Sequence, residues 1–189
     1  MHGFKEKGRV NTSAAAAMAV ETALRYNTDI VAASNTGVTI DALLEEKRKQ
    51  NYTGTINHGT HAQGFIKKDE NELSEEKRQE LQSQGVKVIT SGHALSGAER
   101  GISSVFKGAY PVEIVAHTLR MFGAGVKVCV ECALMAADNG AVSVSKPVVC
   151  VGGSGGGADT VCVLTPSYSS KLFELKINEI ICKPLLIEG

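Results

Sequence analysis

The sequence predicts a layered α/β fold in a single domain that spans residues 1–189. Short segments rich in Val, Ile and Ala alternate along the chain with longer segments of helical periodicity, which is typical of helices packed on a sheet. The length of 189 residues suits one domain, and the chain has no internal repeat or linker. Hydrophobic residues make up 43% of the chain, enough for a substantial core.

The first predicted elements are a helix, a strand and a second helix. Good helix formers fill 14–25, and the Asn-Thr-Ser run before them offers N-cap side chains. Residues 29–34 are apolar and short, so we expect a buried strand there. After an Asn-Thr-Gly break, residues 38–49 place apolar side chains on one helical face and predict the second helix.

The middle of the chain predicts two strands on either side of a third helix. Residues 53–57 form the first strand, and the stretch 58–65 is expected to be irregular. Residues 74–84 begin with Ser-Glu-Glu, an acidic first turn that suits the helix dipole. Gly85 can take the left-handed conformation that ends the helix, and 86–91 is the next strand.

The last part of the chain begins with a long glycine- and serine-rich stretch. Residues 92–110 show little periodicity, so we expect a loop. Pro111 suits the first turn of a helix over 112–122. Residues 127–139 are apolar nearly all round and predict a buried helix, with a strand at its start as the alternative. Three further strands are expected at 148–151, 161–165 and 177–181.

Loops rich in Gly, Ser, Thr, Asn and His follow four of the predicted strands. An open α/β sheet binds its ligands in the crevice beyond the carboxyl ends of the strands. We therefore expect a ligand site built from the loops 34–39, 57–64, 91–104 and 152–160.

The first of these loops leads directly into the N-terminus of a helix. Its residues Ser34, Thr36, Gly37 and Thr39 supply hydroxyl groups and a flexible backbone. Unpaired N–H groups and the positive end of the helix dipole attract an anion at such a point. The alternative is that Asn35 or Thr36 simply caps the helix.

A glycine cluster follows the predicted strand 148–151. Residues 153–158 formally match the G-x-G-x-x-[GA] fingerprint of dinucleotide-binding proteins. The residues that follow resemble a strand and not the required helix, so we do not expect a Rossmann site. Two interpretations stay open: the backbone passes close to a ligand, or the cluster is a flexible connection.

Histidines and an arginine add polar groups to the same loops. His58 and His61 have H-x-x-H spacing, and His93 follows another strand. A metal site is the less favoured interpretation, because no carboxylate lies at a ligand-like spacing. We expect no metal, and hydrogen bonds to a phosphate or a ring instead. Arg100 has a planar fork that suits phosphate, although a surface position is the alternative.

The cysteines lie in apolar surroundings, and their odd number favours reduced thiols over disulfides. They are Cys129, Cys132, Cys150, Cys162 and Cys182. The formal C-x-x-C over 129–132 lacks the polar context of a redox motif, so we expect inert core thiols. Glu131 within it needs a partner, either an internal salt bridge or the ligand crevice.

Charge and hydropathy exclude several partners. Lysine plus arginine and aspartate plus glutamate both total 20, so we expect no nucleic-acid partner. No apolar run approaches the roughly 20 residues that span a bilayer, so we expect no membrane. Residues 1–10 are polar and unlike a secretory signal, which together with the cysteines predicts a cytoplasmic location.

Residues 31–39, VAASNTGVT, resemble the strand–loop–helix of the pyruvate kinase C-terminal domain. More specifically, the chain resembles stand-alone archaeal and bacterial proteins of this α/β domain family. Matching motifs run in one order along nearly the whole chain, in the stretches 11–12, 93–97, 100–103, 111–114, 118–121, 127–131, 135–138 and 157–160.

This resemblance implies a three-layer α/β/α domain with a mostly parallel, mixed sheet of about five main strands. It also implies that flavin mononucleotide (FMN) binds in the crevice. The resemblance and the residue patterns together give these candidate ligand-binding residues: Asn11, Thr12, Ser34, Asn35, Thr36, Gly37, Thr39, His58, His93, Ala94, Leu95, Ser96, Arg100, Gly101, Glu131, Gly153, Ala158, Asp159 and Thr160.

The chain also departs from the family. Its N-terminal segment is short and polar, so the opening strand is expected to be missing or altered. The stretch 57–65 matches the family only loosely. The chain is too short for the pyruvate kinase barrel of about 250 residues, so kinase activity is not expected.

Three functions remain open, and no catalytic residue is assigned. The first is a binding or regulatory module for a phosphorylated small molecule such as FMN. The second is a flavin-dependent oxidoreductase, in which His93, Glu131 or Asp159 handles a proton. The third is a self-association domain, with a homodimer like that implied by the pyruvate kinase resemblance.

Overall fold

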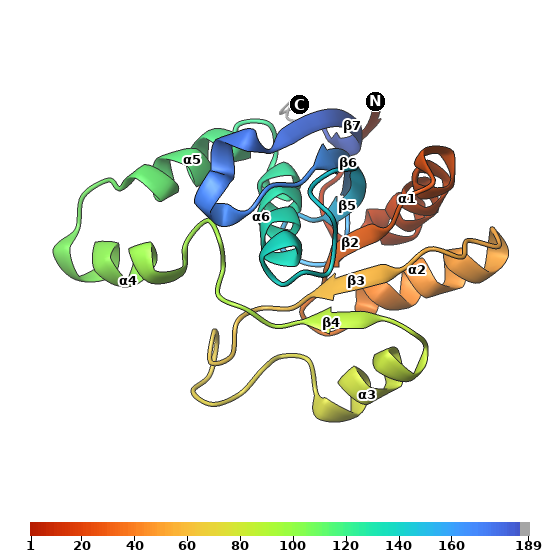
Figure 1. Cartoon of the computed structure of the whole chain (residues 1–189), viewed down its shortest axis with the longest axis horizontal. Helices are drawn as coiled ribbons and strands as arrows, with labels where there is room; N and C mark the ends of the chain where they lie inside the picture. Colours follow the sequence, from red (N-terminus) through yellow and green to blue (C-terminus); the bar gives the residue numbers. More distant parts are fainter. Residues whose placement is uncertain (186–189) are drawn as a thin grey trace.

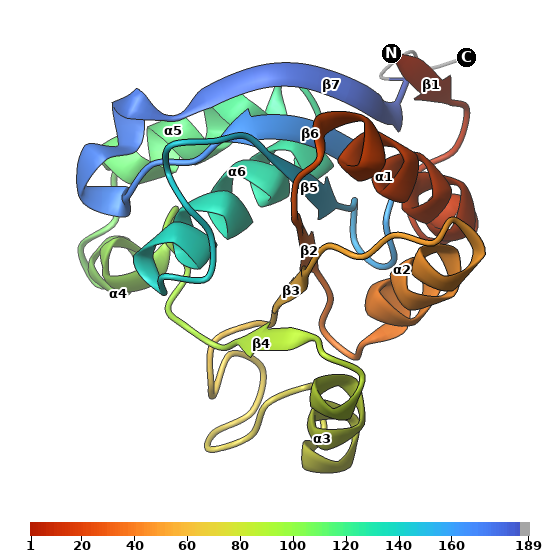
Figure 2. The same cartoon turned by 45° about the vertical axis from the view of Figure 1, so that its right-hand side comes forward.

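The computed structural model describes residues 1–185 and contains one seven-stranded mixed sheet with helices on both faces (Figures 1 and 2). The predicted three-layer α/β/α class is therefore confirmed. The strands are β1 His2–Phe4, β2 Ile30–Ala33, β3 Ile56–Gly59, β4 Lys87–Ile89, β5 Val148–Gly152, β6 Thr160–Thr165 and β7 Lys176–Pro184. They lie in the order β1-β7-β6-β5-β2-β3-β4. Strand β6 runs antiparallel to its neighbours β5 and β7, and the other pairs are parallel.

The described residues form six α-helices, and five of them pack on the sheet. They are α1 Thr12–Tyr26, α2 Val38–Lys49, α3 Glu75–Ser83, α4 Gly97–Phe106, α5 Pro111–Arg120 and α6 Ala124–Asp138. Two 3-10 turns span Arg9–Asn11 and Ser169–Glu174. Helices α1 to α3 pack on one face, and α5 and α6 pack on the other. No helix in the described part of the chain is long and apolar enough to cross a membrane.

The two faces of the sheet divide the core by the two-residue period of its strands. Along β2, Ile30 and Ala32 pack against α1 and α2, whereas Val31 packs against α6. Strand β5 divides in the same way, with Val149 on the first side and Cys150 on the second. Because α6 lies between the sheet and α5, it is buried nearly all round, as its apolar sequence predicts.

The ends of the helices confirm some cap predictions and correct others. The Ser74 hydroxyl accepts a hydrogen bond from Lys77 N at 3.2 Å, and Gly85 takes a left-handed φ of +80°. Asn11 of the Asn-Thr-Ser run occupies the N-cap position of α1, but its side chain forms no capping hydrogen bond. Helix α6 begins at Ala124, so the alternative of a strand at its start is wrong.

Two strand predictions need correction. The N-terminal segment does contain an opening strand: β1 forms one edge of the sheet and pairs in parallel with β7. Strand β3 begins three residues later than predicted and includes His58, which pairs with Ala32 of β2. Parallel pairing with β2 sets this register, and the local sequence, with Gly54 and polar residues on both sides, does not indicate it.

The expected loop over 92–110 is also partly wrong, because α4 lies within it. Its glycine and serine residues lower helix propensity and hide the apolar i, i+3, i+4 spacing of Ile102, Val105 and Phe106. Helix α4 lies beside α5 at one end of the molecule (Figures 1 and 2).

Candidate functional site

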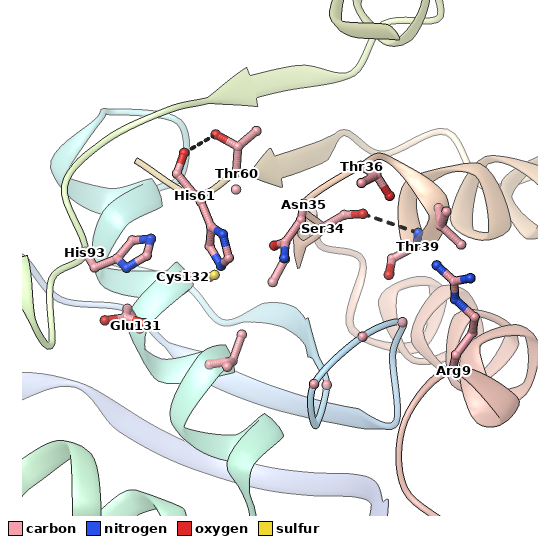
Figure 3. Close-up of a pocket in the computed structure, with 18 of the residues that line it drawn as sticks. Arg9, Ser34, Asn35, Thr36, Thr39, Thr60, His61, His93, Glu131 and Cys132 are labelled. Carbon is pink, nitrogen blue, oxygen red and sulfur yellow. Dashed lines mark hydrogen bonds between the residues drawn. The ribbon is translucent and has the colours of Figure 1, made fainter. Parts of the chain in front are cut away.

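A pocket of about 430 Å³ opens at the carboxyl ends of β2, β3 and β5 (Figure 3). Strands β2 and β5 are neighbours, but the chain leaves β2 for α2 and leaves β5 for the hairpin to β6. The two loops diverge there, which is the arrangement that opens a ligand crevice in α/β sheets. The α6 side chains Val128, Cys132 and Met135 give the pocket an apolar wall.

The loop between β2 and α2 forms one end of this pocket. The Ser34 hydroxyl accepts hydrogen bonds from Gly37 N at 3.1 Å and from Thr39 N at 3.4 Å. Gly37 occupies the N-cap position of α2, and the Ser34 hydroxyl accepts the hydrogen bonds there, so the alternative that Asn35 or Thr36 caps the helix is wrong. Gly37 has a φ of +96°, which its missing side chain permits.

Part of the α2 N-terminus stays open to a ligand. Among residues 1–185, no protein group accepts a hydrogen bond from the backbone N–H of Thr36 or of Val38. Both residues line the pocket, as do Asn35 and the hydroxyl-bearing Thr39. Free N–H groups at the positive end of a helix dipole form a site for an anion.

Arg9 is a pocket residue that the sequence analysis missed. It lies in the 3-10 turn before α1, and its guanidinium group is directed toward Thr39 (Figure 3). The side chain is exposed and forms no ion pair or hydrogen bond within the described residues. Its only sequence signal is its place next to the Asn11–Thr12 motif, because the fold alone brings it to the α2 N-terminus.

The glycine cluster forms the wall below Arg9. Gly155, Gly156 and Gly157 have φ values of +85°, +134° and +64°. A side chain on Gly157 would lie 2.4 Å from Thr12 Oγ1 and 2.6 Å from Arg9 Cα. The backbone therefore does make a close approach, and the approach is to the N-terminal turn of the same chain.

Several predicted ligand contacts hold this wall in place instead of lining the pocket. The buried Asp159 carboxylate accepts hydrogen bonds from Gly8 N at 2.7 Å and Ser154 N at 3.1 Å. It also accepts one from the Thr160 hydroxyl at 2.8 Å. The Thr12 hydroxyl accepts one from Ala158 N at 3.0 Å. These bonds join the start of the chain to the glycine cluster.

Asn11, another predicted ligand contact, does not line the pocket. Its side-chain amide donates a hydrogen bond to Glu6 O at 2.7 Å within the N-terminal segment.

The rings of His61 and His93 lie at the opposite end of the pocket, and Phe65, which is not a lining residue, packs against both. The ring of His61 lies 4.1 Å from Phe65 and 5.3 Å from His93, measured between centroids. Phe65 and His93 are 4.8 Å apart. His61 Nδ1 also contacts the carboxylate of Glu72. The 57–65 stretch, which matched the family loosely, thus supplies two of these three rings.

Glu131 lies near His93. The sequence left open whether its carboxylate forms an internal salt bridge or faces the pocket, and the structure shows both. It forms a buried ion pair with Lys127, one helical turn away, and it lines the pocket. Its Oε1 accepts a hydrogen bond from Leu95 N at 2.9 Å. Burial lowers the pKa of His93, and this outweighs the opposite effect of the Glu131 carboxylate. His93 is therefore neutral at pH 7.

The cysteines are all buried and free, as predicted. Cys132 lines the pocket, but burial raises the pKa of its thiol to about 12. Burial likewise raises the pKa of Cys129 and Cys150. A thiol that stays protonated is a poor nucleophile, so the cysteines act as small apolar side chains here.

His58 was expected in the loop 57–64, but it lies within strand β3. It is fully buried in β3, and its Nε2 donates a hydrogen bond to Ser34 O at 2.6 Å. Burial lowers the pKa of His58 to about 4. The ring thus supports the β2–α2 loop from behind the pocket.

The structure brings only part of the candidate set together. The candidates that line the pocket are Ser34, Asn35, Thr36, Thr39, His93, Glu131 and Gly153. The pocket is not lined by Ala94, Leu95 or Ser96, which connect His93 to helix α4. Arg100 and Gly101 lie on the exposed helix α4. No group of three metal-ligating side chains among residues 1–185 is placed to hold a metal ion.

The fold and the pocket define an α/β domain with a pocket at a topological switch point of its sheet. No model of a known protein family matches the chain. The resemblance to the pyruvate kinase C-terminal domain remains a prediction.

Proposed function

We propose that this protein is a binding or regulatory module for a phosphorylated small molecule, and that the molecule is FMN. One observation supports this proposal: a single pocket has a helix N-terminus with unpaired backbone N–H groups at one end and the imidazole rings of His61 and His93 at the other. The motifs shared with the stand-alone pyruvate kinase C-terminal domains support the same ligand.

The residues present fit both ends of FMN. The N–H groups of Thr36 and Val38, the Thr39 hydroxyl and the Arg9 guanidinium are donors, which suits a phosphate. The apolar wall of α6 and the rings of His61 and His93 suit a flat ring system. Bound FMN would supply redox chemistry, and the protein would supply position and electrostatics.

A flavin-dependent oxidoreductase is the second candidate function, and His93 favours it. Within the described residues, neither ring nitrogen of His93 has a hydrogen-bond partner, although the side chain lines the pocket. A neutral imidazole can accept a proton or release one, and the fixed Glu131 carboxylate would stabilise its charged form. Reduction of bound flavin by NADH or NADPH would favour this candidate over simple binding.

A titration with FMN and riboflavin tests the proposed function. The quenching of flavin fluorescence should show that FMN binds at least tenfold more tightly than riboflavin, which lacks the phosphate. Ser34→Asp should weaken FMN binding at least tenfold, because it places a negative charge at the anion site. Arg9→Ala should also weaken FMN binding, because it removes a proposed donor to the phosphate.

Two control variants make this test specific. Ser34→Ala removes the hydroxyl without adding charge and should weaken FMN binding less than Ser34→Asp does. Ser170→Asp adds the same charge at an exposed position outside the pocket and should leave binding unchanged. Equal affinity for FMN and riboflavin would place the phosphate elsewhere, and the absence of any quenching would exclude both flavin functions.

A further inference from the structure

A second cavity, of about 370 Å³, adjoins the candidate pocket, and the side chains of His93 and Met135 line both. The loop from β4 to α4, the first turn of α4 and the end of α6 form this second cavity, together with Ser169. We call it the α4–α6 cleft. Its volume lies in the range of roughly 300–1,000 Å³ that is typical of small-molecule sites.

Side chains with unused hydrogen-bonding capacity gather in the α4–α6 cleft. The Ser91 hydroxyl oxygen is buried, and it has no hydrogen-bond partner among residues 1–185. The side chains of Asn139 and Ser169 also form no hydrogen bond with the described residues. Buried polar groups are normally paired with protein, with water or with a ligand. These three side chains are therefore available to a polar ligand.

The charge of the cleft is negative. Among the described residues that line it, Asp138 is the only charged one. One oxygen of its carboxylate accepts a hydrogen bond from Ser169 N at 3.0 Å, and the other has no partner within residues 1–185. His93 adds no positive charge at pH 7, because burial lowers its pKa. The lining of the cleft therefore favours a cation over an anion.

The first turn of α4 adds backbone donors to the cleft. The N–H groups of Gly97 and Ala98 have no acceptor among residues 1–185, and both residues line the cleft. Such groups donate to the oxygen of a hydroxyl group as well as to a carboxylate. The polar groups of the cleft thus suit a ligand with several hydroxyl groups, and the sign of its charge is the property to test.

We propose that the α4–α6 cleft binds a small hydroxylated amine, which is a molecule with several hydroxyl groups and one positively charged amino group. The amino group would pair with the free oxygen of Asp138, and the hydroxyl groups would pair with Ser91, Asn139 and the start of α4. The bound molecule would share the imidazole of His93 with the proposed FMN site. Apart from His93 and Met135 the two cavities have different linings, so this proposal does not depend on FMN binding.

Three six-carbon ligands that differ only at carbon 1 test the proposal on the full chain. Glucamine carries a charged amino group there, sorbitol a hydroxyl group and gluconate a carboxylate. In NMR titrations at pH 7, in a buffer without amines, glucamine should shift the backbone amide signals of Gly92 and Gly97. It should bind roughly fivefold more tightly than sorbitol, as expected for an ion pair open to solvent. Gluconate should bind more weakly than sorbitol.

Three variants locate the binding in the cleft. Asp138→Asn keeps an acceptor for Ser169 N but removes the charge, so it should lower the affinity for glucamine to that for sorbitol. Glu21→Gln removes the same charge from the exposed side of α1, on the other face of the sheet, and should change neither affinity. Ala98→Met fills part of the cleft and should weaken the binding of both ligands.

An FMN titration separates this site from the candidate pocket. Asp138→Asn should bind FMN like the wild type, because Asp138 does not line that pocket. If glucamine binds and FMN does not, the proposed function fails and the present proposal stands. Three results would overturn the present proposal: no shift of the Gly92 and Gly97 signals with glucamine, binding of gluconate at least as tight as that of glucamine, or an unchanged preference for glucamine over sorbitol in Asp138→Asn.

Discussion

At the scale of single residues, buried polar side chains shape the pocket more than exposed ones do. Ser34 uses its hydroxyl to organise the α2 N-terminus, and Asp159 uses its carboxylate to fasten the glycine cluster. Glu131 is held by Lys127 and by a backbone N–H, so its charge is fixed in position. A buried polar group that lacks such partners would cost stability. These groups therefore fix where the hydrogen-bond donors that line the pocket lie.

The thiols give a prediction at this scale. Iodoacetamide at pH 8 should leave the cysteines of the native protein unmodified over a time that alkylates all five in denatured protein. Burial raises the pKa of Cys132 and of Cys182 to about 12, so the reactive thiolate is scarce. Mass spectrometry counts the alkyl groups.

The variant Cys132→Ala should also retain FMN binding, because the thiol contributes only apolar contact at the pocket wall. Rapid alkylation of Cys132 in the native protein would instead indicate a redox or nucleophilic role for the C-x-x-C pair.

At the scale of elements, local sequence predicts most of the helices and strands. Helix α2 begins and ends at the predicted residues, and α1, α3 and α5 lie close to theirs, because their apolar periodicity and capping chemistry are strong. The misplaced elements, β3 and α4, have weak local signals. Pairing with β2 sets the register of β3, and the glycine and serine residues of α4 lower its helix propensity.

The glycine cluster gives a prediction at this scale. Gly157→Ala and Gly140→Ala both put a side chain at a similar left-handed φ, +64° and +69°. Only the first also meets other atoms, at Thr12 and at the backbone of Arg9. We expect Gly140→Ala to cost about 1 kcal/mol of unfolding free energy and Gly157→Ala about 2–4 kcal/mol.

Urea denaturation measures both costs. Gly157→Ala should also weaken FMN binding, because relief of the clash moves Arg9, whereas Gly140→Ala should not. Equal losses of stability in the two variants would mean that the close approach of the cluster to the N-terminal turn contributes nothing.

At the scale of the whole molecule, His58 links stability to pH. Its pKa is about 4 in the folded protein, below its ordinary value of 6.5, because it is buried. Between these two pH values the unfolded chain binds a proton that the folded protein does not. Stability is therefore fully present above pH 6.5, falls as pH falls toward 4, and loses about 3 kcal/mol in total through this residue.

Urea denaturation between pH 4 and pH 7 tests this link. His58→Gln should show a smaller loss of unfolding free energy than the wild type over this range. Part of the loss should remain in the variant, because burial lowers the pKa of His93 as well. If the wild type and the variant have the same pH dependence, His58 is not buried in its neutral form.

The sequence by itself determined the α/β class, most helix boundaries to within a few residues, the burial of the cysteines and the strand–loop–helix connection at Ser34. Each of these depends on neighbouring residues, which periodicity and capping chemistry describe. Only the tertiary structure decided that Arg9 reaches α2, that His58 is buried behind the pocket, and that Asp159 and Thr12 support its wall. These contacts join residues far apart in the chain, and no local pattern encodes which strands become neighbours in the sheet.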